Sequence, residues 1–108
     1  MSEWVTVAQT ADVREGEMLG TTVAGVDVLV ANVGGEYRSI GSECTHAGCF
    51  LHEDGELDQD QAVVTCQCHG SVFDLETGEA VGPPASVGVL VYNVRVEGDE
   101  IQVATPGV

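Results

Sequence analysis

All four cysteines and all three histidines of this 108-residue chain lie between residues 44 and 70. Two short boxes hold most of them: CTHAGC over residues 44–49 and CQCHG over residues 66–70. Each box offers a thiolate and an imidazole close together, Cys44 with His46 and Cys66 with His69, and contains a glycine where a tight loop needs one. Two such loops that face each other could hold a metal.

Three chemistries compete for these residues. A disulfide framework uses four cysteines, but it leaves the histidines unexplained and suits a secreted protein better. A tetrahedral zinc site with two cysteines and two histidines takes the same ligands. In the third, a two-iron cluster, two cysteines bind one iron and two histidines bind the other.

The elements that must position these boxes are short β-strands. Residues 26–42 contain an alternating apolar run, a Gly34-Gly35 turn and a second strand, which is the pattern of a hairpin. Valines and isoleucines around a Gly98-Asp99 turn predict a second hairpin. Other β-rich runs cover residues 62–66, 71–75, 87–98 and 100–104. Helical periodicity is weak, with candidates only over residues 11–18 and after Cys49, so we expect an all-β antiparallel sandwich or small barrel.

Length and charge restrict the function. The chain has the size of a single domain, 1–108, and its 44% hydrophobic content is that of a globular protein. Eighteen acidic residues face three arginines and no lysine, giving a formal net charge of −15. Such a charge disfavours binding to nucleic acid or to anionic membranes, and it agrees with steering toward a basic protein partner or with solubility alone. No apolar run is long enough for membrane insertion and the N-terminus does not look like a secretory signal, so we expect a cytoplasmic protein.

The two boxes resemble the cluster-binding loops of the Rieske [2Fe-2S] proteins. The similarity continues through SVFDLETGEAVGPPA, where the family commonly has an aromatic residue, an aspartate, a TG turn and a proline-bearing third loop. The resemblance implies that Cys44 and Cys66 bind the inner iron and that His46 and His69 bind the outer iron. The implied fold is a Rieske-like sandwich with a small cluster-binding subdomain over about residues 43–84.

The resemblance also assigns roles around the cluster. A pair at Cys49 and Cys68 forms a disulfide between the two loops in part of the family, whereas many dioxygenase ferredoxins lack it. Ser71 matches a serine that donates a hydrogen bond to a bridging sulfide, which raises the potential. Phe73 stands where the quinol-oxidising members carry a tyrosine, and Pro83 belongs to the third loop. One tuning donor is thus present and one is missing, which predicts an intermediate to moderately high potential.

The remaining histidine and the acidic run receive simpler interpretations. We expect His52 to be a solvated loop residue with no ligand role. The acidic residues between the boxes are expected mainly to form a solvated surface, although they could contribute to a docking patch. These residues are Glu53, Asp54, Glu56, Asp58 and Asp60.

The family resemblance implies a soluble one-electron carrier, a Rieske-type ferredoxin with one [2Fe-2S] cluster and no catalysis of its own. Its donor would be a flavin- or NAD(P)H-dependent reductase, and its acceptor an oxygenase or another oxidoreductase. A second hypothesis is a Rieske subunit of a larger oxidoreductase or respiratory assembly with a higher-potential cluster. A third is a structural zinc module that binds another protein.

Overall fold

The computed structural model describes residues 4–43, 49–68, 70–83 and 87–104 of the chain. Its secondary structure is almost entirely strand, as predicted, and all the strand pairs are antiparallel. The strands are β1 (Trp4–Gln9), β2 (Met18–Val23), β3 (Val26–Val33), β4 (Glu36–Gly41), β5 (Gly55–Asp58), β6 (Val63–Cys66), β7 (Val72–Asp74), β8 (Ala80–Gly82), β9 (Val91–Tyr92), β10 (Val94–Glu97) and β11 (Glu100–Ala104).

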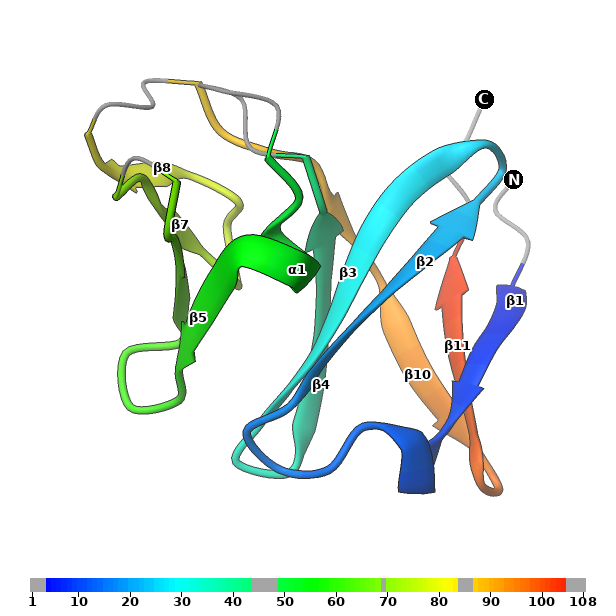
Figure 1. The fold of residues 1–108 in the computed structure, drawn as a ribbon. Helices are drawn as coiled ribbons and strands as arrows, with labels where there is room; N and C mark the ends of the chain where they lie inside the picture. Colours follow the sequence, from blue (N-terminus) through cyan, green and yellow to red (C-terminus); the bar gives the residue numbers. More distant parts are fainter. Residues whose placement is uncertain (1–3, 44–48, 69, 84–86, 105–108) are drawn as a thin grey trace.

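These strands form three sheets, in the orders β1-β11-β10, β2-β3-β4-β9 and β5-β6-β7-β8. Figure 1 shows the β2-β3-β4 strands between the other two sheets, with β5–β8 on one side and β1, β10 and β11 on the other. Both predicted hairpins are confirmed. Val33 pairs with Glu36 across Gly34-Gly35, whose φ angles are 61° and 95°, and Glu97 pairs with Glu100 across the second turn. Positive φ at both central residues is what a tight, twisted hairpin requires.

Two hydrophobic clusters hold the sheets together. One joins the middle sheet to the β5–β8 sheet and includes Leu29, Ile40, Leu51, Val64 and Phe73, all fully buried. The other packs the middle sheet against the β1-β11-β10 sheet, through a second set of side chains: Val13, Val23, Val28, Val30, Tyr92, Ile101 and Val103. Because successive residues of β3 point to opposite faces, this one strand contributes to both clusters.

Of the two predicted helical segments, one is confirmed and the other is wrong. The stretch after Cys49 does contain a short helix, α1 (Leu51–Asp54). The candidate over residues 11–18 is wrong: the chain makes only a 3-10 helix at Thr10–Asp12 and then turns into β2. The Glu17 carboxylate accepts a hydrogen bond from the Arg14 backbone N–H at 2.8 Å, and Gly16 has a φ of 85°, so this segment is a turn. No helix in the described part of the chain is long and apolar enough to cross a membrane.

The run over residues 87–98 is also interrupted. Residues 88–90 are irregular, and Asn93 separates β9 from β10. The break has a structural reason, because β9 pairs with β4 in the middle sheet whereas β10 pairs with β11 in the outer sheet. The chain therefore changes sheets at Asn93.

Candidate metal centre

The second box forms a tight turn at the end of β6. Cys66 is fully buried, and its backbone N–H donates to the Ser71 carbonyl at 2.7 Å. The Gly70 N–H donates to the Cys66 carbonyl at 2.8 Å, and Gly70 has a φ of 84°, a conformation that suits glycine. The turn thus fixes Cys66 on the buried side of the box while Gln67 and Cys68 are exposed.

The disulfide between Cys49 and Cys68 is present and links the two boxes. Its sulfur atoms are 2.11 Å apart and its Cα atoms 6.7 Å apart. The sulfur of Cys66 lies within 4.8 Å of both bonded sulfurs. The chain has therefore brought the end of the first box and the start of the second box to one place, although they are nineteen residues apart in sequence.

The residues flanking the first box close it at its base. Glu43 forms an isolated antiparallel bridge with Phe50, and the Leu51 N–H donates to the Ser42 carbonyl at 2.6 Å. Ser42 is fully buried, and its own N–H donates to the Asp27 carbonyl at 3.0 Å. The residues that follow β4 and the residues that begin α1 are therefore bonded to each other, and we call this closure the neck.

His52 contributes to this neck, so its interpretation as a solvated loop residue is wrong. The residue belongs to α1 and its side chain is only 25% exposed. Its Nδ1 lies 2.6 Å from the Ser42 hydroxyl, and its ring lies 5.8 Å from that of Phe50. The ring also occupies the space beside Gly20 on β2 that a Cβ would fill. His52 thus fastens α1 to the middle sheet.

The second box is bonded to the end of α1 and to β5. The Gln67 N–H donates to the Asp54 carbonyl at 2.7 Å, and the Gln67 side-chain amide donates to the Glu56 carboxylate at 2.9 Å. The Asp58 carboxylate accepts hydrogen bonds from the backbone N–H groups of Asp60 and of residue 61, so it stabilises the turn that follows β5. Within the acidic run, the carboxylates of Glu56 and Asp58 thus accept hydrogen bonds, although only Asp58 is half-buried. The other three acidic residues are exposed: Glu53, Asp54 and Asp60.

The segment before the third loop is a capped turn. The Asp74 carboxylate accepts hydrogen bonds from the N–H groups of Glu76, at 2.7 Å, and Thr77, at 3.1 Å. Gly78 has a φ of 74°, and a Cβ there would collide with the Val89 carbonyl. The TG turn and the aspartate of the sequence pattern thus have direct structural roles. Pro83 lies exposed in a turn after β8.

Only Cys66 among the four predicted ligands lies in the described part of the chain; Cys44, His46 and His69 lie outside it. The described surroundings fit a sulfur-ligated cluster. A buried thiol ends a strand, the two boxes are held together beside it by a disulfide, and Ser71 is fully buried next to the turn. Phe73 is also fully buried, in the cluster that joins the two sheets. A soft sulfur donor in a buried loop suits iron better than it suits hard cations.

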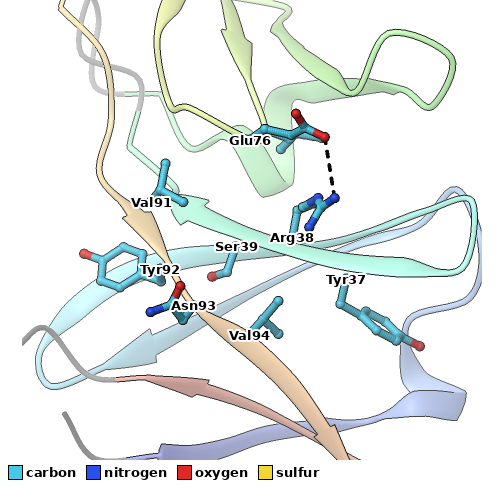
Figure 2. Close-up of a pocket in the computed structure, with 9 residues that line it drawn as sticks. Tyr37, Arg38, Ser39, Glu76, Val91, Tyr92, Asn93 and Val94 are labelled. Atoms are coloured by element: carbon cyan, nitrogen blue, oxygen red, sulfur yellow. Dashed lines mark hydrogen bonds and ion pairs between the residues drawn. The ribbon is translucent and has the colours of Figure 1, made fainter.

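A separate hollow of about 420 Å³ lies beside β4, at the point where the chain passes from β9 to β10. Figure 2 shows Arg38 pointing to one side of β4, where it pairs with Glu76 at 3.5 Å, and Ser39 pointing to the other side, near Val94. Among the described residues, neither a cysteine nor a histidine lines this hollow.

Sequence reasoning missed Ser42, Gly20 and Gln67. The signal for Ser42 is its position two residues before Cys44, next to a predicted loop. Gly20 breaks a run of strand residues, which often marks a close approach by another group. Ser42 and Gly20 both contact the ring of His52, which belongs to another element. The sequence alone does not identify these contacts.

Comparisons with known proteins identify the family of this chain. The family model for the Rieske [2Fe-2S] domain matches residues 3–98. The chain is 40% identical to the 3-phenylpropionate/cinnamic acid dioxygenase ferredoxin subunit of Escherichia coli (strain K12), over 89% of this chain and 88% of that protein. It is 37% identical to the biphenyl 2,3-dioxygenase ferredoxin component of Rhodococcus jostii (strain RHA1), over 94% of this chain and 92% of that protein.

Solved structures show the same similarity. The ferredoxin of carbazole 1,9a-dioxygenase from Nocardioides aromaticivorans IC177 superposes with a TM-score of 0.90 at 30% identity, covering 95% of this chain and 98% of that one. A chain in a complex of reduced oxygenase and oxidised ferredoxin of carbazole 1,9a-dioxygenase gives a TM-score of 0.87 at 29% identity, covering 97% and 96%. These relatives are electron-carrier components and not catalytic subunits. The chain belongs to the Rieske [2Fe-2S] domain family.

Proposed function

We propose that this protein is the ferredoxin of a multi-component oxygenase system. It takes one electron from a reductase, of the flavin- or NAD(P)H-dependent kind, and passes it to a terminal oxygenase. The observation that carries this proposal is the match to dioxygenase ferredoxins over about nine tenths of the length of the chain. We place the carrier in the cytoplasm, where its NAD(P)H-dependent donor would be found.

We further propose that Cys44, Cys66, His46 and His69 hold one [2Fe-2S] cluster. When bound, the cluster supplies a single-electron acceptor whose two neutral imidazole ligands place its potential in the range of roughly −150 to +300 mV, above the value of about −400 mV for plant-type ferredoxins. The protein's own residues hold the ligand loops. The neck at Ser42 closes the first loop, the turn from Cys66 to Ser71 shapes the second, and the disulfide joins them.

The disulfide favours a second candidate, a Rieske subunit of a larger oxidoreductase with a higher-potential cluster. By resemblance, this pair is typical of quinol-oxidising members and is lacking in many dioxygenase ferredoxins. The mass of the purified protein and of its native complexes separates the two candidates. A colourless protein that contains zinc would contradict both.

The first test is an EPR spectrum of the purified protein after ascorbate, compared with the spectrum after dithionite. A Rieske signal that needs dithionite supports a low-potential ferredoxin that serves an oxygenase. A signal already complete with ascorbate supports the second candidate. The absence of a Rieske signal under both conditions would overturn the proposed ligand set.

A further inference from the structure

Two exposed apolar side chains from distant parts of the sequence meet at one place on the surface. Seven large hydrophobic side chains are exposed in the described part of the chain, among them Val26 and Leu90. Val26, at the start of β3, and Leu90, in the segment before β9, line the same hollow. Scattered apolar residues need no explanation, but exposed apolar side chains that share a hollow indicate a candidate interaction site.

The hollow has a volume of about 400 Å³ and is built from three segments distant in sequence. Gly25 comes from the β2–β3 turn and Val26 and Asp27 from the start of β3. Gly41 ends β4 and Glu43 follows it, while Gly88, Val89 and Leu90 come from the irregular segment before β9. The Gly41 N–H donates to the Leu90 carbonyl at 2.9 Å, which fixes this segment along β4. Leu90 is 69% exposed and Val26 is 40% exposed. The hollow is therefore a recess with exposed apolar side chains, and it lies at the start of β3 and the end of β4.

The hollow reaches the residue that precedes the first box. Glu43, one of its lining residues, directly precedes Cys44 in the chain and forms the bridge with Phe50 that closes the neck. A protein seated in the hollow would therefore contact the residue next to a proposed cluster ligand in the chain.

The charge around the hollow selects the kind of partner. Asp27 and Glu43 are exposed at its edge, and none of the three arginines lines it. Arg38 pairs with Glu36 and Glu76, and Arg95 stacks over the Trp4 ring at 4.2 Å. A second copy of this chain is a poor occupant, because two molecules with a net charge of −15 repel each other. Nucleic acid is excluded by the same repulsion.

We propose that this hollow is a docking site for a redox partner protein whose contact face has an exposed apolar side chain or edge surrounded by lysines and arginines. This inference rests on the proposed electron-carrier function and adds the chemistry of the partner's face to it. Leu90 and Val26 supply apolar contact, while Asp27 and Glu43 supply attraction. Apolar contacts at the centre of an interface mainly slow dissociation, whereas charges at its rim mainly speed association.

The test uses the cluster-loaded protein and cytochrome c, a basic haem protein whose haem edge is surrounded by lysines, as the probe. Binding is measured by calorimetry with both proteins oxidised, at low and at high ionic strength. We expect Leu90→Ser and Val26→Ser each to raise the Kd by about fivefold. We expect Asp27→Asn to raise the Kd at low ionic strength and to reduce the salt dependence of the Kd.

Matched controls lie on the outer sheet. Val96 on β10 is 44% exposed, and Glu97 follows it on the same strand. Val96→Ser and Glu97→Gln remove an equivalent apolar side chain and an equivalent charge outside the hollow, and they should leave the Kd unchanged. Equal effects of the hollow variants and these controls, or a wild-type protein that does not bind the probe at low salt, would overturn the docking site.

The visible and EPR spectra of each variant are recorded in parallel. They should match those of the wild-type protein, because the substituted side chains are exposed. A wild-type protein without a Rieske spectrum would refute the proposed function, whereas a normal spectrum with unchanged binding in the hollow variants would refute only the docking site.

Discussion

The Nδ1 atom of His52 lies 2.6 Å from the hydroxyl oxygen of Ser42, at the neck of the first cluster loop. Ser42 is fully buried, and the His52 ring occupies the space left by Gly20. This contact joins α1 to the end of β4 across the base of the loop. The loss of one partner leaves the other with an unsatisfied polar group, which costs about 1–3 kcal/mol when that group is buried.

The contact predicts coupled effects of Ser42→Ala and His52→Gln on cluster retention. Each single variant should lose the cluster about fivefold faster on heating, because the neck is weakened by about 1 kcal/mol. The double variant should lose it no faster than the worse single variant, since the interaction can be removed only once. Bleaching of the visible spectrum measures the rate. Strictly multiplicative rates would show that the two side chains act independently.

The disulfide should contribute to stability in the same assay. Replacing Cys49 and Cys68 together by serine removes a link between two loops, a change that typically costs about 2–4 kcal/mol. We expect faster loss of the cluster in the double variant and in wild-type protein treated with a dithiol. Thiol titration under denaturing conditions verifies the reduction. A reduced protein that keeps its cluster as long as the oxidised form would contradict a stabilising role for the bridge.

Ser71 should tune the potential. Ser71→Ala removes a hydroxyl that, by resemblance, donates to the cluster, so the potential should fall by on the order of tens of millivolts without loss of the cluster. A redox titration followed by visible absorbance measures this shift.

Ser39 provides the matched control for Ser71. It is also a buried serine, but it lies on β4, beside the hollow shown in Figure 2. Ser39→Ala should leave the potential unchanged. Equal potentials for the two variants would remove Ser71 from the surroundings of the cluster.

Tyr92 predicts a loss of stability at alkaline pH. Burial raises the pKa of its phenol above the ordinary value of 10.0, because the charged form is disfavoured inside the protein. The unfolded chain therefore releases this proton at a lower pH than the folded protein does. The free energy of unfolding should be unaffected by this group below about pH 9 and should fall as the pH rises past 10.

Tyr92→Phe removes the titrating group and keeps the ring. Between about pH 9 and about pH 11, an interval that brackets the ordinary tyrosine pKa of about 10, the free energy of unfolding should fall less in the variant than in the wild-type protein. Urea unfolding followed by circular dichroism measures the difference. Parallel pH profiles for the two proteins would show that Tyr92 does not ionise differently in the folded state.

The sequence by itself determined the features that depend on neighbouring residues. The glycines of Gly34-Gly35 and the Gly98-Asp99 turn fix two hairpins, because a tight turn is selected by the residues within it. Alternating apolar residues identified the strands, since side chains of a strand point to alternate faces. The spacing of cysteine and histidine in the two boxes limited the chemistry to a few soft-ligand sites.

Only the tertiary structure decided how distant segments meet. His52 appeared to belong to a polar loop, yet its ring packs beside Gly20 and bonds to Ser42. The run over residues 87–98 looked continuous, yet it breaks at Asn93 because its two halves join different sheets. The apolar hollow at Leu90 likewise requires three segments from across the chain. Local patterns specify strands and turns, but contacts between segments far apart in sequence depend on which sheets pack together, and no short stretch of sequence encodes that choice.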